Sequence, residues 1–506
     1  MRQFITCSCI VIGLILWSTQ SKAQGLLDGL RLSTSGTGTS ARGLSMGGAL
    51  VGAVNDWSAL EYNPAALTLV EHNEFNVALY NRSYSSSADF LSTNSSDDIT
   101  NTVPYSFAYA APVPTDRGHL AFGLSVDRIA DFTSTYRFSA VNPSSSYLNT
   151  SGFVNDPGYR SGLFSNYLSF LDSTNMAWAL YLTRPLDSTQ PKLTTPYSGG
   201  MLQSGTVTQE GGLNAFRIGA GVDVAENVSI GATVNVLFGS YDYRRTYSET
   251  DVNGVYNRPD SAPPYNLKSA TITDVRSQSI SGVSLKLALY TEPNEYLRFG
   301  LTFTTPTVYS IDDHFTRTGV ASFTNGSTYR SSDWPNTEPS ISNSYSITSP
   351  ASVSVGGSFS HWGLTLAASA SYTDYSQLHF SGDNVDLSDL NDAARSLLHG
   401  VLAWNVGGEY MINPIGVLLR GGFSSTPSAY KDDPSNYGTK TWSTGVGILL
   451  SKSTILELAY RHSSYTTDHS LYSDVTAGPN PTSVSASIDK DEISLSELAI
   501  SFSFRF

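Results

Sequence analysis

From residue 73 to the C-terminus, the chain repeats segments of about ten residues in which apolar and polar side chains alternate. In the last segment every second residue from Leu498 to Phe506 is apolar, whereas Glu497, Ser501 and Arg505 lie on the other face. This alternation predicts β-strands that have one apolar face. Charged residues and glycines recur on the polar face in mid-strand, which favours a barrel with lipid outside and a polar lumen over a sandwich.

The connections between these segments alternate between short and long. Short turns lie at 112–118, 225–227, 292–295, 361–362, 413–414 and 451–453. The connections between those turns are long and rich in Ser, Thr, Asn, Asp and Pro, as expected for periplasmic turns and extracellular loops. The pattern predicts an all-β protein, an antiparallel transmembrane barrel of about 14 strands whose closure leaves no unpaired edge in lipid. The predicted strands are 73–85, 103–112, 118–130, 213–224, 228–244, 277–290, 296–312, 345–360, 363–378, 400–412, 415–425, 439–451, 454–466 and 491–506.

The first residues have the pattern of a secretory signal peptide at 1–23. Arg2 provides a positive charge, the stretch 4–17 is almost entirely apolar, and 21–23 offers small residues before a cleavage point at Gln24. The alternative interpretation is an uncleaved anchor. Cleavage would place the mature protein outside the cytoplasm.

Composition supports export and argues against several classes of function. Cys7 and Cys9 both lie in the predicted signal peptide, so the mature chain would contain no disulfide. The 29 Tyr and 42 Gly, with only 14% charged residues, favour strands and turns. A net charge of −14, which would become −16 on loss of Arg2 and Lys22, disfavours nucleic-acid binding. Acidic pairs in the predicted loops indicate solvated surface charge, with weak contact to divalent ions or lipopolysaccharide as the alternative. These pairs are Asp97-Asp98, Asp312-Asp313 and Asp432-Asp433.

Residues 24–72 do not follow the strand pattern. They contain glycine-rich turns, a small-residue stretch at 43–54, and Asn63-Pro64, which blocks continuation of a helix at that point. The segment is apolar and poor in charge, so we expect short helical pieces that pack against another part of the chain rather than a flexible tail. We therefore predict an N-terminal hatch, or plug, inside a barrel formed by residues 73–506.

Three motifs stand out in this segment: Ala41-Arg42-Gly43-Leu44-Ser45-Met46-Gly47-Gly48-Ala49, Asn55-Asp56-Trp57-Ser58-Ala59 and Asn63-Pro64-Ala65-Ala66-Leu67. With these hatch motifs the chain resembles the FadL-type long-chain fatty acid transporter family of outer-membrane proteins. Weaker similarities at 118–126, 352–365 and 418–427 extend the resemblance over most of the mature chain. The resemblance implies a barrel plugged by the hatch, which takes up hydrophobic ligand from outside and releases it through a lateral opening beside a kinked strand.

The resemblance also implies roles for individual hatch residues. Asn63, Pro64 and Ala65 would shape or gate the plug, and Gly47 and Gly48 would allow close approach to the wall. The alternative for Asn63-Pro64 is a turn that only seats the plug, although plug shape and gating can be the same property.

The long connections depart from the family pattern, above all residues 131–212 after the third strand. Two apolar stripes at helical spacing in the loops are candidates for capturing ligand. The alternative for each stripe is a helix that packs on the barrel rim as a lid. One stripe is Leu163, Phe164, Tyr167, Leu168 and Leu171, and the other is Leu387, Leu390, Ala394, Leu397 and Leu398.

Two functional hypotheses follow. The first is a channel in the outer membrane of a Gram-negative bacterium for passive uptake of hydrophobic compounds such as long-chain fatty acids or aromatic hydrocarbons. The alternative is a barrel that serves as scaffold or shuttle in a machine for protein secretion or surface attachment, with a protein partner. Sequence motifs of hydrolases, metalloproteases and nucleotide-binding loops are absent, so we expect no enzyme, no cofactor and no metal site.

Overall fold

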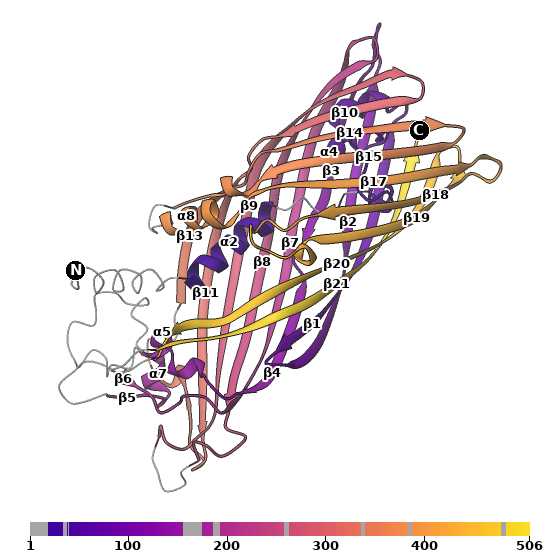
Figure 1. The fold of residues 1–506 in the computed structure, drawn as a ribbon. Coiled ribbons are helices and arrows are strands. Elements are labelled where there is room, and N and C mark those ends of the chain that lie inside the picture. The colour runs from indigo at the N-terminus through magenta and orange to yellow at the C-terminus, as the bar shows by residue number, and fades with distance from the viewer. Residues whose placement is uncertain are drawn as a thin grey trace, which may run out of the picture.

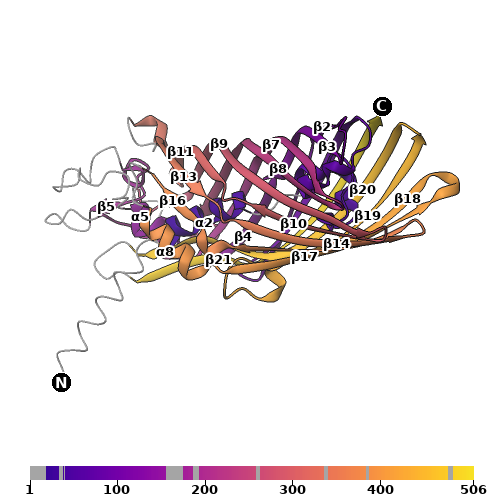
Figure 2. The same ribbon diagram turned by 90° about the horizontal axis from the view of Figure 1, so that it is seen from above.

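The computed structural model describes most of the chain and shows a closed antiparallel β-barrel with helices inside it (Figures 1 and 2). No helix in the described part of the chain is long and apolar enough to cross a membrane. The described residues are 19–33, 38, 40–154, 175–185, 193–257, 263–334, 340–382, 387–476 and 482–506.

Fourteen antiparallel strands form the barrel, as predicted. Strand β1 pairs with β21 from Glu74↔Arg505 to Asp89↔Lys490, which closes the sheet. Some strands are interrupted once and carry two labels. In order around the wall they are β1 (Glu74–Phe90), β2 (Thr93–Val113), β3 (Leu120–Asp131) with β4 (Ser134–Asn142), β7 (Met201–Ala225), β8 (Val228–Thr250), β9 (Leu267–Asn294), β10 (Leu297–Thr304) with β11 (Val308–Phe323), β13 (Ser340–Thr348) with β14 (Ser352–His361), β15 (Leu364–Asp374) with β16 (His379–Ser381), β17 (Gly400–Ile412), β18 (Val417–Thr426), β19 (Thr439–Ser451), β20 (Thr454–Val475) and β21 (Ser483–Arg505).

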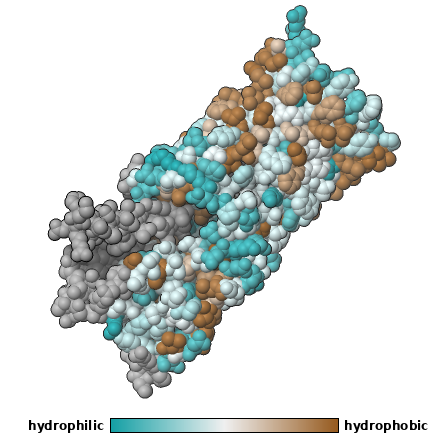
Figure 3. All heavy atoms as spheres, viewed as in Figure 1, coloured by the Kyte–Doolittle hydropathy of each residue, from teal (hydrophilic) through white to brown (hydrophobic). Residues whose placement is uncertain are grey.

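Exposed apolar side chains gather on the half of the barrel that carries the short turns, as the face drawn in Figure 3 shows. We call this region the apolar band. Leu498 and Phe504 are 51% and 41% exposed on its outer face, as lipid contact requires. Exposed aromatic rings lie at the outer limit of this band, where Trp404 contacts Phe423 and Trp442 contacts Tyr460 with ring centroids 5.4 Å apart in each pair. Aromatic girdles of this kind mark the membrane interfaces of barrels.

Many strands continue well beyond the apolar band, which corrects several predicted boundaries. Strand β9 begins at Leu267 rather than at 277, and β21 begins at Ser483 rather than at 491. Part of the predicted loop 131–212 is also wall, because β4 pairs with the first residues of β7 from Ser134↔Gln209 to Asn142↔Met201. In these extensions the apolar residues face inward, as Tyr136, Phe138 and Ala140 do in β4, and the outward residues are mostly polar. The extensions therefore lack the outward apolar face that marks the membrane strands.

The connections at the other end of the barrel carry short helices and strands. Strands β5 and β6 pair with each other, and β12 pairs with the end of β11. These elements are η2 (Tyr147–Asn149), α5 (Ser151–Val154), α7 (Met176–Ala179), β5 (Arg184–Pro185), β6 (Leu193–Thr194), β12 (Thr328–Arg330), η3 (Ser331–Asp333), η4 (Tyr375–Gln377), α8 (Ser388–Leu397) and η6 (Ser435–Tyr437), while η5 (Asn413–Ile415) lies in a short turn at the opposite end.

The N-terminal segment lies inside the barrel, as the composition predicted (Figures 1 and 2). Its helices are α2 (Thr19–Ser33), α3 (Ala41–Ser45), α4 (Ala59–Tyr62) and η1 (Pro64–Leu69). Ser40 caps α3 by accepting a 3.0 Å hydrogen bond from Gly43 N, which fixes the start of this helix. Asn63 caps η1 because its side chain accepts a hydrogen bond from Ala65 N. The proline that follows is a favourable first residue of a helix. We call residues 40–70 the hatch.

Candidate functional site

The hatch rests directly on the backbone of the wall, at glycines whose missing side chains leave room for it. A Cβ at Gly300 would overlap the carbonyl oxygen of Val51, and one at Gly422 would overlap the backbone nitrogen of Gly47. This contact explains why glycines are frequent on the lumen face of the strands: at these positions any larger residue would displace the hatch. The wall glycines that contact the hatch, here called the glycine belt, are Gly123, Gly219, Gly221, Gly231, Gly300, Gly356, Gly407, Gly422 and Gly445.

Hatch glycines make the reciprocal approach. Gly47 and Gly48 have φ of +66° and +81°, a backbone conformation that L side chains rarely adopt. A Cβ at Gly47 would lie 2.8 Å from Phe423 N, whereas one at Gly48 would lie 3.7 Å from Asn405 Nδ2. The close approach to the wall is therefore strict at Gly47 and looser at Gly48.

Asn63 connects the hatch to itself and to the wall. Its Nδ2 donates to the carbonyl oxygens of Val51 at 2.9 Å and Leu289 at 3.2 Å, and its Oδ1 accepts from Ala65 N at 3.1 Å. Asn63, Pro64 and Ala65 are all buried. The turn and the wall contact thus belong to one fully hydrogen-bonded side chain.

Two buried ion-pair networks join the hatch to the strands. Arg42 bonds to Glu409 at 3.2 Å, and Arg420 links Glu409 at 2.6 Å to Glu457 at 2.7 Å. Arg42 also reaches Asp56, at 3.4 Å within the hatch. The sequence indicates charges inside the barrel through their mid-strand positions, but it does not show that they pair with the hatch.

The second network lies on a different part of the wall, on β3, β7 and β9. Glu61 of the hatch pairs with Arg217 of β7 and, at 3.6 Å, with Lys286 of β9. Arg217 in turn pairs with Asp127 of β3, which accepts a further hydrogen bond from Ser125. Removal of one partner would leave a buried charge without compensation, so both networks hold the hatch in one position.

An apolar compartment lies beside the hatch, between the wall and the loop that carries α8. Rings of Phe132 and Tyr241 pack edge to face with centroids 5.9 Å apart. Wall strands, α2 and the α8 loop all contribute to it. Its buried members, here called the lumen cluster, are Leu26, Leu32, Phe132, Leu213, Ala215, Leu237, Tyr241, Ile280, Tyr309, Ile311, Ile347, Tyr375, Leu378, Phe380, Ala393, Ala394, Leu398 and Val401.

The α8 stripe faces this compartment with most of its residues. Ala394 and Leu398 are fully buried in the lumen cluster, and Leu387 and Leu390 pack against it. Leu397 points away and is 47% exposed. The other predicted stripe, Leu163, Phe164, Tyr167, Leu168 and Leu171, lies outside the described residues.

Two tyrosines next to α8 are neutral over a wide pH range. Burial raises the pKa of Tyr375, and burial followed by the nearby charges of Asp433 and Asp468 raises the pKa of Tyr430 to about 12. Both rings therefore act as apolar surface of the α8 loop.

The wall has a long gap in its backbone pairing beside the third strand. Strand β2 pairs with β3 only from Ser106↔Asp127 to Val113↔Leu120, and β4 pairs with β7 rather than with β2. Above that point, side chains bridge the two sides: Asn101 Nδ2 donates to Asp131 at 3.0 Å, and Thr135 Oγ1 donates to Asp97 at 2.8 Å. Phe132 of the lumen cluster lies at the break between β3 and β4.

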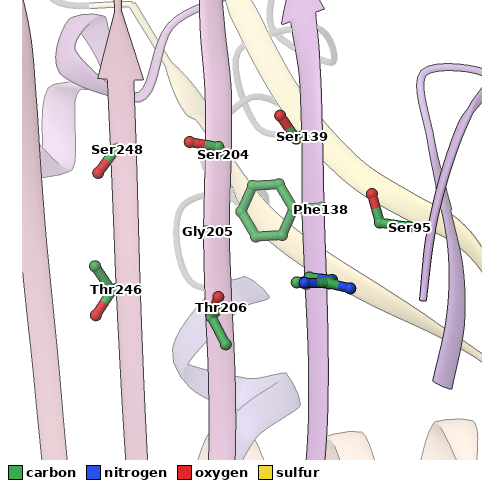
Figure 4. Close-up of a pocket in the computed structure, with 9 residues that line it drawn as sticks. Ser95, Phe138, Ser139, Ser204, Gly205, Thr206, Thr246 and Ser248 are labelled. Atoms are coloured by element: carbon green, nitrogen blue, oxygen red, sulfur yellow. The ribbon is translucent and has the colours of Figure 1, made fainter. Parts of the chain in front are cut away.

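Two depressions on the outer surface are separate from the lumen. One, of about 300 Å³, lies beside hydroxyl groups of β4, β7 and β8 and ends at Phe138, which is nearly completely buried (Figure 4). The other, of about 450 Å³, is an apolar groove on the lipid face beside Phe299, Phe359 and Leu366. Neither includes a residue that the sequence predicted for the site.

One cluster of a serine, a histidine and a carboxylate lies on the wall, but its serine and histidine are not arranged for hydrolysis. Asp491 accepts from Ser86 at 2.7 Å and from His469 Nε2 at 2.9 Å, so the serine and the histidine both bond to the carboxylate. A nucleophile–base pair would need a direct hydrogen bond between them. Within those residues, no cluster of three or more His, Cys, Asp or Glu is placed to hold a metal ion.

Together, these features define a closed, plugged transmembrane β-barrel. Among solved structures, the chain is similar to the toluene transporter TodX of P. putida, at 13% identity over 93% of this chain and 99% of that chain, with a TM-score of 0.54. It is similar to a Pseudomonas aeruginosa FadL homologue at 14% identity over 94% and 99%, again with a TM-score of 0.54. These structural similarities, at low sequence identity, show a shared FadL-like fold. A family model described as BamG matches residues 187–411, and comparison with curated proteins found no match.

Proposed function

We propose that this chain is an outer-membrane channel for passive uptake of hydrophobic compounds in a Gram-negative bacterium. The observation that carries the proposal is the lumen cluster, an apolar compartment formed by side chains of the wall, α2 and the α8 loop. Burial of each methylene group of a ligand in such a compartment stabilises it by about 0.8 kcal/mol. The fold shared with a toluene transporter and a FadL homologue supports the same function.

The gap between β2 and the third strand supports a lateral route for the ligand. The fixed hatch fills the lumen on the side of the short turns, whereas Phe132 connects the lumen cluster to the gap. The gap starts next to Phe107 and Val126, which are 51% and 40% exposed in the apolar band. A ligand that leaves there reaches lipid without passing through the hatch, and no catalytic or energy-coupling step is required.

Disulfides that lock the gap test this route. Asn101→Cys with Thr133→Cys joins positions whose side chains are 3.2 Å apart across the gap, and Ser85→Cys with Asp98→Cys is a control across an already paired part of β1 and β2. We expect oxidation to stop uptake of radiolabelled oleate and of toluene by cells that express the first variant, and to leave the control unchanged. Full uptake by the oxidised gap variant would refute the route. Absence of uptake by the unmodified folded chain, with a stable protein partner in mild detergent, would favour the secretion scaffold.

A further inference from the structure

Helix α2 occupies the lumen cluster in the way that a bound amphipathic molecule would. Leu26 and Leu32 are 1% and 6% exposed and belong to the cluster, whereas Leu27 points away at 49% exposure. The hydroxyl group of Tyr309 donates a 2.9 Å hydrogen bond to the carbonyl oxygen of Leu32. The apolar surface that this helix covers is therefore the same surface on which the proposed function rests.

The helix also places one carboxylate in the compartment, and the wall has three donors for it. Asp28 is 2% exposed, and its Oδ2 lies 3.0 Å from Arg276 Nη1, 3.4 Å from Gln278 Nε2 and 3.4 Å from Tyr345 Oη. Arg276 and Gln278 belong to β9, and Tyr345 belongs to β13. The three wall donors thus converge on a single oxygen atom that the helix supplies.

These wall donors keep their arrangement through contacts outside α2. Arg276 Nε and Nη2 donate to the carboxylate of Asp313 at 2.8 and 2.9 Å, and Gln278 Nε2 lies 3.1 Å from Tyr345 Oη. Within α2, Arg31 Nη1 lies 2.9 Å from Asp28 Oδ1. Displacement of α2 would remove these two opposite charges together, so the net charge of the lumen would not change. An open cradle for a carboxylate would remain next to apolar surface.

Contacts of α2 with the α8 loop depend on two small residues one helical turn apart. A Cβ at Gly25 would lie 2.7 Å from Leu390 Cδ1, and a Cβ at Gly29 would lie 2.8 Å from Phe380 Cζ. At Gly300, Gly407 and Gly422 of the glycine belt an added Cβ would meet hatch backbone, whereas the atoms met here belong to side chains. The α8 loop can therefore repack around a different occupant.

We propose that α2 is a built-in competitor: it fills the lumen site for a molecule with one apolar chain and one carboxylate, and such a ligand binds only by displacing it. The proposal rests on the proposed function. Asp28 takes the place of the ligand carboxylate, and Leu26 and Leu32 take the place of its chain. Only molecules in which α2 is displaced can bind ligand. The apparent affinity is therefore the affinity of the open site multiplied by the fraction of molecules in which α2 is displaced.

A disulfide between α2 and α8 tests the displacement. Gly25→Cys with Leu390→Cys replaces the two positions in contact, and the crosslink would hold α2 in the compartment. We expect the oxidised, folded barrel to bind radiolabelled oleate at least about tenfold more weakly than the same protein after reduction. Gly25→Cys alone, treated with oxidant, is the control for the chemistry. Equal oleate affinity before and after reduction of the crosslink would overturn the proposal.

A charge on the buried face of α2 gives the opposite effect without a crosslink. Leu26→Asp places an unpaired carboxylate in the lumen cluster and should expel the helix, so oleate should bind about tenfold tighter. The matched variant Leu27→Asp, one residue along the same helix but exposed, should bind oleate like the unmodified chain. An unchanged or weaker oleate affinity of folded Leu26→Asp would contradict displacement.

Methyl oleate distinguishes this inference from the proposed function. Gln278→Leu removes one donor of the cradle, and it should weaken binding of oleate but leave binding of its neutral methyl ester unchanged. Equal losses for the two compounds would overturn the carboxylate cradle. If both compounds bind every variant equally, only the role of α2 and the cradle fails. If neither compound binds any folded form, the proposed uptake function fails as well.

Discussion

The hatch and helix α2 both fill the lumen, but they contact the wall in different ways. At most positions of the glycine belt the hatch meets the wall backbone on backbone, and buried ion pairs join it to the strands. Helix α2 packs through side chains and has one buried carboxylate in a cradle of donors. Close packing of backbone on backbone allows only one position of the hatch. The side-chain contacts of α2, in contrast, can be replaced by contacts with another apolar molecule. The comparison indicates a fixed plug and an exchangeable occupant.

The largest effect should come from the ion pairs of the hatch. Arg420→Met would leave Glu409 and Glu457 buried with less compensation, and loss of one partner of a buried pair costs about 3 to 5 kcal/mol. Urea unfolding of the purified barrel, followed by its heat-modifiable gel mobility, measures the loss. Arg395→Met is the control, since Arg395 pairs with Asp392 on the surface and such pairs contribute about 0 to 1 kcal/mol.

Next in size is the apolar contact of α8 with the lumen cluster. Leu398 is completely buried, and Leu398→Ala should lower stability by about 2 to 5 kcal/mol if the contact belongs to the folded barrel. Leu397→Ala, at the neighbouring exposed position, should have little effect. The same unfolding assay checks both variants. If Leu398→Ala makes the α8 loop more sensitive to protease but leaves global unfolding unchanged, α8 and α2 open independently of the barrel. That result would strengthen the contrast between the hatch and α2.

A smaller loss is expected from a single methyl group in the glycine belt. Gly422→Ala would push a Cβ into the backbone of Met46 and Gly47, and overpacking of this kind costs about 1 to 3 kcal/mol or more. Gly421 is the adjacent control, because the nearest atom to its added Cβ, Ser443 O, is 3.9 Å away. Urea unfolding of the two variants tests the idea that the hatch has no room to move. Equal stability of both would show that the hatch can shift at low cost.

The sequence predicts the strands that face lipid, because lipid contact requires an apolar outward face. It does not predict the parts of the fold that depend on contacts between distant residues. Alternation revealed the strands in the apolar band, where the apolar face points outward. In β4 the apolar residues point inward and the outward face is mostly polar, so residues 134–142 looked like loop. The place of Asn63 in the hatch followed from a motif. The pairing of Arg42 with Glu409 did not, because 367 residues separate them and no local pattern connects them. The cradle for Asp28 was hidden for the same reason.

The smallest stability change should come from Asn63→Ala, and it decides what the hatch motif does. The substitution leaves the carbonyl oxygens of Val51 and Leu289 without this donor, which costs about 1 to 3 kcal/mol in a buried site. We expect the barrel to fold and oleate uptake to change, because the contact that fixes the hatch against β9 is lost. Asn81→Ala is the control, since Asn81 bonds to Thr102 at the exposed surface. Unaltered uptake by folded Asn63→Ala would reduce the motif to a turn that seats the plug.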